Sequence, residues 1–86
     1  MIVGNNSKVQ GLVHRIVLAL VDNPDKVQVT ATDSEQGTIF LVTVAPTDVG
    51  KIIGKGGRTA QSLRSLLSEI GMTSKTRYSL DIVSRQ

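Results

Sequence analysis

Residues 49–58 read VGKIIGKGGR, and this glycine-rich stretch is the most informative part of the sequence. A Walker A loop has the pattern GxxxxGK followed by serine or threonine. Here the spacing from Gly50 to Gly54 is one residue too short, and Gly56 stands where the hydroxyl should be. A dinucleotide-binding loop has GxGxxG directly after a strand. Here a helical turn precedes the loop and the third glycine is missing, so neither nucleotide-binding fold is predicted.

The remaining interpretation is a GxxG loop, residues 54–57, that joins two helices. Glycines allow a tight backbone turn, and without side chains the loop can lie flush against a sugar-phosphate backbone. Amide groups at the start of the following helix point toward such an anion, where the helix dipole also favours negative charge. Lys55 and Arg58 add positive charge. Because GxxG alone occurs by chance in many chains, the flanking elements decide whether this interpretation holds.

Both flanks of the loop have helical spacing. Before it, Pro46 or Thr47 opens a short helix whose apolar side contains Val49, Ile52 and Ile53. After it, apolar residues at spacings of one, three and four predict a longer helix that ends at Gly71. Its expected inward residues are Ala60, Leu63, Leu66, Leu67 and Ile70.

Strand patterns lie outside these helices. Residues 38–44 are rich in β-branched side chains and place Phe40, Val42 and Val44 on one face. Residues 27–31 alternate as well, and the polar turn between the two segments predicts an antiparallel hairpin. A strand within residues 76–83 closes the chain. The second face of 38–44 is also apolar, which is interpreted as ordinary scatter of exposed apolar residues more than as a contact surface.

A further helix is predicted ahead of the hairpin. Residues 1–6 are expected to be a short leader, with Asn6 or Ser7 capping a helix over residues 8–21. Its apolar stripe contains Val9, Leu12, Val13, Ile16, Val17 and Leu20. The helix should end at the proline turn that follows, where Asp22 and Asp25 are interpreted as caps.

The amino-acid composition excludes several classes of function. The 86 residues are 40% hydrophobic, which indicates one small globular domain. There is no cysteine, so disulfides, thiolate zinc sites and thiol catalysis are excluded. The one histidine, His14, cannot build a metal cluster alone, and no paired carboxylates form a recognisable site; no enzyme activity, cofactor or metal is expected. No apolar run approaches the roughly 20 residues of a membrane span, and a cytoplasmic location is expected.

Charge is divided along the sequence. The net charge is +3, but residues 21–49 carry one lysine against five acidic residues. Residues 50–77 carry six basic residues against one glutamate. A basic block around the glycine loop predicts a surface that could meet an anion, although basic residues also commonly just solvate a helix face.

The loop and its flanks resemble the KH domain: an Ile-Ile pair precedes Gly54, and Leu63 follows it by nine residues. A helix and a strand ahead of the core resemble the type II arrangement. The resemblance implies an α+β fold over residues 7–86, a single KH domain. Its order would be helix, strand, strand, helix, GxxG loop, helix, strand, with a three-stranded mixed sheet and three helices on one face.

From about residue 7 to residue 83 the chain further resembles the small bacterial single-KH RNA-binding proteins of the KhpA type. The similar stretches are ALVDNP at 19–24, VAP at 44–46, Asp48, GKIIGK at 50–55 and GR at 57–58. This resemblance implies a cytoplasmic binder of single-stranded RNA that acts in post-transcriptional regulation, as an RNA chaperone. It also implies a homodimer or pairing with a larger Jag-type KH protein. Gly56, Thr59 and Ser62 depart from the usual residues, which bears on affinity more than on fold.

The same resemblance assigns the site. The RNA-binding residues it implies are Lys51, Ile52, Ile53, Gly54, Lys55, Gly56, Gly57, Arg58, Leu63 and Arg64. The four loop residues would hold the RNA backbone and the basic residues would flank it. The three apolar residues would contact bases, but core packing is a strong alternative for each of them and is the favoured interpretation of Leu63. An alternative function is a protein-interaction adaptor that keeps a KH shape and binds RNA weakly or not at all.

Overall fold

The computed structural model describes residues 4–85, which form three strands and three α-helices. In order they are α1 (Gly4–Leu20), β1 (Gln28–Ser34), β2 (Gly37–Val44), α2 (Val49–Ile53), α3 (Arg58–Ser74) and β3 (Tyr78–Ser84). Short 3₁₀ turns lie at Pro24–Lys26, Pro46–Asp48 and Lys55–Gly57. The predicted order of elements is therefore confirmed, including the helix–loop–helix around the glycines.

The sheet is mixed, with β2 in the centre. β1 and β2 form the predicted antiparallel hairpin, in which Ala31 lies opposite Phe40. β3 pairs parallel with the other side of β2, and Leu80 is the partner of Phe40 there. Parallel neighbours require a long crossover connection, and the segment from α2 to α3 supplies it.

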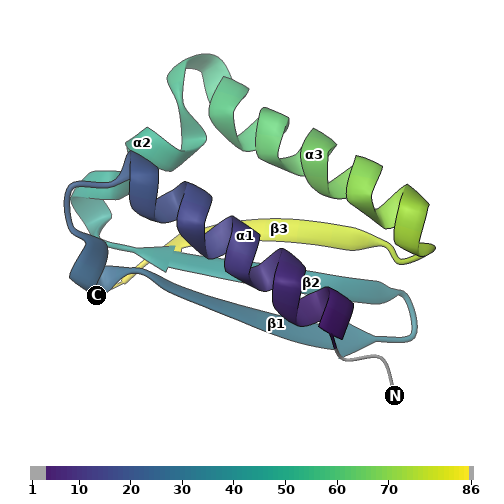
Figure 1. Ribbon diagram of the computed structural model, residues 1–86. Coiled ribbons are helices and arrows are strands. Elements are labelled where there is room, and N and C mark those ends of the chain that lie inside the picture. Colours follow the sequence, from purple (N-terminus) through teal and green to yellow (C-terminus); the bar gives the residue numbers. More distant parts are fainter. Residues whose placement is uncertain (1–3, 86) are drawn as a thin grey trace.

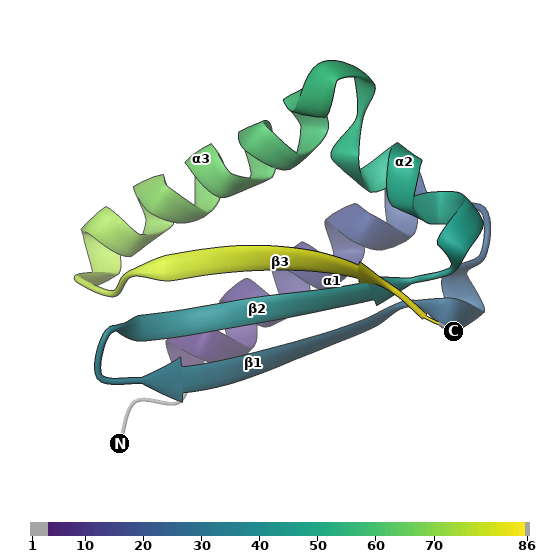
Figure 2. The ribbon, with the colours of Figure 1, turned by 180° about the vertical axis from the view of Figure 1, so that it is seen from behind.

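All three helices cover one face of the sheet (Figure 1). α1 lies across the hairpin and α3 lies along β3; seen from behind, the other face of the sheet is uncovered (Figure 2). That open face carries the exposed side chains of Ile39, Leu41 and Val83. The division of β2 into a buried and an exposed face is as the alternation predicts.

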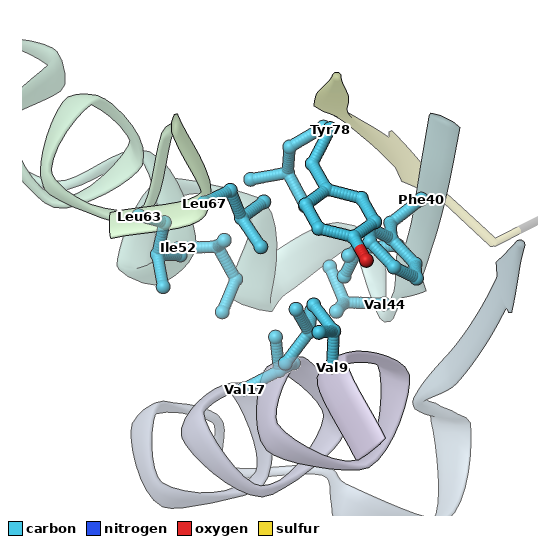
Figure 3. Packing of buried hydrophobic residues seen from close by; sticks show 11 residues of the cluster. Val9, Val17, Phe40, Val44, Ile52, Leu63, Leu67 and Tyr78 are labelled. Carbon is cyan, nitrogen blue, oxygen red and sulfur yellow. The ribbon is translucent and has the colours of Figure 1, made fainter. Parts of the chain in front are cut away.

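Side chains from the three helices and from the sheet meet in one core (Figure 3). The rings of Phe40 and Tyr78 lie with centroids 5.5 Å apart. The buried cluster consists of Val9, Val13, Val17, Phe40, Val42, Val44, Ile52, Leu63, Leu67, Tyr78 and Leu80. Burial of these apolar side chains is the main contribution that stabilises so small a domain.

The start of α1 differs from the prediction. The helix begins at Gly4, inside the segment expected to be a leader, and residues 1–3 lie outside the described part of the chain. Asn6 and Ser7, predicted as possible caps, therefore lie inside the helix and cannot cap its start. The Asn6 side chain instead donates to Asp33 Oδ1 (3.0 Å) and accepts from the Tyr78 hydroxyl (3.0 Å). Leu12, expected inside, is 38% exposed, since the buried stripe of α1 is narrower than its apolar pattern.

The end of α3 also differs. The helix continues past Gly71 to Ser74, and Lys75 adopts the left-handed conformation that ends it. Gly71 is buried because the chain folds back over it: a Cβ there would collide with the carbonyl oxygen of Thr76. Leu66, expected to point inward, is exposed, because the core contacts of α3 come from Ala60, Leu63 and Leu67.

Candidate nucleic-acid interface

The GxxG loop has a backbone that requires glycine. Gly54, Gly56 and Gly57 have φ values of 80°, 65° and 78°, in the left-handed region that other residues rarely adopt. The N–H of Gly54 donates to the Gly50 carbonyl at 2.8 Å and closes α2. At Gly54 a Cβ would also collide with the Thr59 side chain. The loop is thus a tight connection in which three of four residues have no side chain.

The loop feeds directly into α3. Its last glycine, Gly57, is the N-cap residue and has no side chain with which to cap the first amides of this 17-residue helix. Arg58, exposed, is the first helical residue, and the first turn contains no acidic residue. Lys55, at the middle of the loop, is exposed as well. The positive end of a helix and two exposed cations therefore coincide at this point, an arrangement that favours phosphate.

An open hollow of about 450 Å³ continues from the loop along α3. It is lined by Gly56, Gly57, Gln61, Arg64, Ser65 and Ser68. Arg64 spans the distance to the sheet, because its Nε and Nη2 atoms donate to the Leu80 carbonyl of β3 at 3.4 and 3.3 Å. The structure therefore brings Arg64 next to the loop glycines and to the edge of the sheet.

The three apolar candidates differ in how far their side chains are exposed. Ile52 has no exposed surface and Leu63 is 6% exposed, and both belong to the core cluster. Ile53 is 39% exposed. In this structure Ile52 and Leu63 have the core-packing role, because α2 and α3 turn these side chains toward the sheet. Ile53 is the apolar candidate that presents surface beside the loop.

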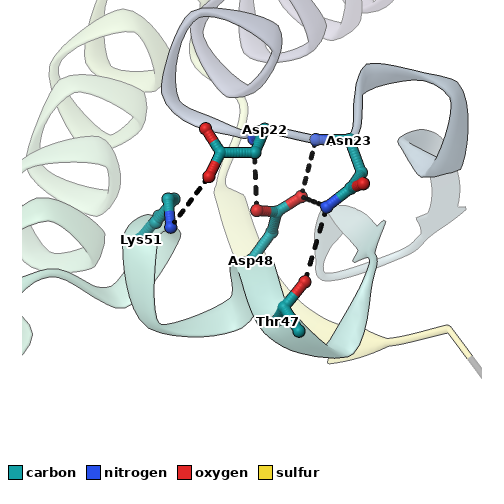
Figure 4. A network of polar contacts seen from close by, with 5 residues as sticks. All are labelled: Asp22, Asn23, Thr47, Asp48 and Lys51. Carbon is teal, nitrogen blue, oxygen red and sulfur yellow. Dashed lines mark hydrogen bonds and ion pairs between the residues drawn. The ribbon is translucent and has the colours of Figure 1, made fainter.

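A buried carboxylate lies just before α2 (Figure 4); the sequence pointed to this Asp48 only as part of the family resemblance, and not as a buried acceptor. Asp48 accepts the backbone N–H groups of Asp22 (3.1 Å) and Asn23 (3.0 Å), and the Asn23 side-chain amide at 3.1 Å. Burial alone would raise the pKa of the Asp48 carboxyl, but these hydrogen bonds, with Lys51 nearby, outweigh burial and hold its pKa below the ordinary 3.8. Asp48 therefore ties the end of α1 to the start of α2.

The acidic residues of the proline turn have different surroundings from those predicted. Asn23 is the N-cap residue of the turn Pro24–Lys26, and its side chain makes no capping bond there. Asp22 instead forms an ion pair with Lys51, with Oδ2 and Nζ 3.2 Å apart (Figure 4). Lys51, expected to flank RNA, thus has an intramolecular partner. The sequence around Asp22 does not predict this ion pair, because its two residues are far apart in the sequence and meet only in the folded chain.

The described residues contain neither a metal-binding cluster nor a membrane-spanning helix. Between residues 4 and 85 no group of three or more histidine, cysteine or acidic residues is placed to hold a metal ion. Within the same range no helix is long and apolar enough to cross a membrane. His14 is exposed on α1 and lines a shallow hollow with Gln10 and Val29.

Comparison with known proteins agrees with this geometry. Residues 10–82 match the family model described as "KhpA/KhpB, KH domain". A protein of Treponema pallidum named RNA-binding protein KhpA is 49% identical over 72 residues, which cover 84% of this chain and 90% of that protein. A protein of the same name from Caldanaerobacter subterraneus subsp. tengcongensis is 44% identical, over 84% of this chain and 96% of that protein. Another from Mycobacterium tuberculosis is 49% identical, over 69% of this chain and 74% of that protein. With a type II KH topology and an intact GxxG loop, the chain belongs to the KhpA/KhpB KH-domain family.

Proposed function

We propose that this protein binds single-stranded RNA, with the sugar-phosphate backbone lying against the GxxG loop. The observation that carries the proposal is the loop itself: glycines with positive φ at the start of α3, flanked by exposed Lys55 and Arg58. KH loops clamp about four nucleotides by such backbone contacts. The relatives named RNA-binding protein KhpA support the same ligand. The role is that of a binding module and not of an enzyme.

Within this proposal the residues have distinct roles. The loop residues 54–57 hold the backbone, while Lys51, Arg58 and Arg64 flank it with positive charge. Ile53 is the apolar surface available to a base, and Ile52 and Leu63 act only by supporting the helices from the core. Both aromatic residues of the chain, Phe40 and Tyr78, are buried. Base stacking on an aromatic platform, as in RRM or cold-shock domains, is therefore not part of the proposal.

The test is fluorescence anisotropy with a short unstructured RNA at two salt concentrations. We expect Lys55→Glu to weaken binding by about tenfold or more, because it reverses a charge at the phosphate contact. Lys8→Glu is the matched control: it changes the net charge equally at an exposed site in α1. The first turns of this helix, drawn in purple, lie far from the connection between α2 and α3 (Figure 1). Wild-type binding should weaken as salt rises.

Two results would contradict RNA binding at the GxxG loop. One is equal RNA binding by the folded Lys55→Glu and Lys8→Glu variants. The other is a wild-type chain that binds no RNA at low salt, in which case the protein-interaction adaptor becomes the better function. Circular dichroism of each variant establishes that the fold is intact.

We further propose that the protein works in the cytoplasm in post-transcriptional regulation, as a homodimer or paired with a larger Jag-type KH protein. Two observations support the pairing. The family model covers both KhpA and KhpB domains. One loop contacts few nucleotides, so a second linked KH domain would raise affinity through effective concentration.

A further inference from the structure

Lys51 lies beside the proposed RNA loop, yet its ammonium group is held by a carboxylate from a distant segment. It belongs to α2, three residues before Gly54, and its Nζ lies 3.2 Å from Asp22 Oδ2. The two side chains remain 45% and 74% exposed. A phosphate arriving from solvent can therefore reach Lys51, but only at a place where an anion already sits.

The backbone that carries the Asp22 carboxylate is held in place by hydrogen bonds. Asp22 N–H donates to Asp48 Oδ1 at 3.1 Å, and Asn23 N–H donates to Asp48 Oδ2 at 3.0 Å (Figure 4). Asp48 is fully buried and precedes Lys51 by three residues, the spacing that places both on neighbouring helical positions. Most exposed ion pairs contribute little because ordering two mobile side chains costs entropy. Here hydrogen bonds to Asp48 hold the backbone of one partner, so that the Asp22 carboxylate starts from a fixed point near Lys51.

We propose that Asp22 is a positioning residue that competes with RNA phosphate for Lys51 and thereby lowers RNA affinity. The inference rests on the proposed RNA contact at the GxxG loop. A carboxylate and a phosphate repel each other, so RNA gains Lys51 only by displacing Asp22. An anion that contacts Lys51 alone gains little binding free energy by displacing Asp22. A ligand that also occupies the GxxG loop gains binding free energy from those further contacts, which offsets the cost of displacing Asp22. The pair therefore favours an extended RNA strand over a free anion.

The experiment compares Asp22→Asn with Asp25→Asn by the same anisotropy assay. Both replacements raise the net charge by one, but Asp25 is exposed in the 3₁₀ turn Pro24–Lys26 and forms no ion pair within residues 4–85. We expect Asp22→Asn to tighten RNA binding by about two- to fivefold, the range that loss of an exposed pair allows. The salt dependence should steepen, because a released Lys51 displaces counterions from RNA. Asp25→Asn should leave both quantities near the wild-type values.

A double-mutant cycle separates competition at Lys51 from a change in fold. In a Lys51→Gln background, Asp22→Asn should have no larger effect than Asp25→Asn, because the contested cation is gone. Asp22→Glu, which keeps the carboxylate, should return affinity to near the wild-type value. The inference is wrong if Asp22→Asn and Asp25→Asn behave alike, or if the gain from Asp22→Asn persists without Lys51. Failure of the RNA-binding proposal looks different: the wild type then does not bind, or Lys55→Glu binds as the wild type does.

Discussion

The carboxylate of Asp48 joins two segments that lie 25 residues apart in the sequence. It is buried without a cation in direct contact, and backbone N–H groups of the turn after α1 supply most of its hydrogen bonds. A buried carboxylate is costly unless it is hydrogen-bonded in this way. Because the next residues form α2 and the GxxG loop, this side chain ties the segment that leads into the loop to the end of α1.

Acid should therefore destabilise the fold through Asp48. Its pKa in the folded protein lies below the ordinary 3.8, so the unfolded chain binds the proton more readily. The stabilisation is fully present above that value and is lost as the pH falls through the lower, folded pKa. We expect Asp48→Asn to lower Tm at neutral pH by more than about 5 °C, because an amide cannot accept from every donor around it. We also expect this variant to lose less stability on acidification than the wild type.

Thermal unfolding followed by circular dichroism at neutral pH and near pH 3 measures both effects. Asp25→Asn, an exposed acidic residue of the neighbouring turn, is the control. If Asp48→Asn and the wild type lost equal stability between the two pH values, Asp48 would not be the responsible group.

At the scale of single residues, the sequence predicts the loop better than its surroundings. The glycines and Lys55 are contiguous, so local pattern alone places them together. The pairing of Lys51 with Asp22 and of Arg64 with the Leu80 carbonyl depends on how helices meet the sheet. Neither contact has a local signal, and for that reason Lys51 and Arg64 were predicted as positive charge that flanks the RNA and not as partners of Asp22 and Leu80.

Among the elements, strands and helices were predictable where one face had to be buried, and their ends were less so. β2 alternates strictly, and its two faces are as expected. The apolar stripes of α1 and α3 are wider than the surfaces they bury, so Leu12 and Leu66 remain exposed. Gly71 was predicted as a helix stop because glycine often occupies that position. Its actual reason is the close approach of the following chain.

Two helix glycines should respond to alanine with opposite signs. Alanine normally stabilises a helix interior relative to glycine, and at Gly11 an added Cβ would meet nothing. We expect Gly11→Ala to stabilise by about 0.5–1 kcal/mol. At Gly71 the Cβ would collide with the Thr76 carbonyl, so Gly71→Ala should destabilise by about 1–3 kcal/mol. Urea unfolding of both variants tests this, and a stabilised Gly71→Ala would show that the chain after α3 can simply move aside.

Across the whole molecule, the order of elements and the resemblance to KH domains were enough to predict the topology. Parallel pairing of β2 with β3 follows once a helix–loop–helix must connect two strands of one sheet. Self-association could not be read in the same way. The open face of the sheet carries Ile39, Leu41 and Val83, but such exposed apolar residues are also ordinary on monomers.

The proposed homodimer is tested at this scale by light scattering after size-exclusion chromatography. We expect the mass to rise toward twice that of the chain as protein concentration increases, since a dimer of small modules dissociates on dilution. A constant monomer mass up to the highest soluble concentration would leave the larger KH partner as the form that supplies a second domain. A mixture with that partner then becomes the sample to measure.

Tyr78 gives the protein a built-in optical probe. The chain has no tryptophan and this one tyrosine, whose ring is buried against Phe40 and whose hydroxyl donates to Asn6 of α1. Its emission therefore reports whether β3, the core and the first turns of α1 are assembled. The GxxG loop contains no such fluorophore. Intrinsic fluorescence can thus follow unfolding of every variant described above without a label, while an RNA-borne dye reports binding in a separate spectral window.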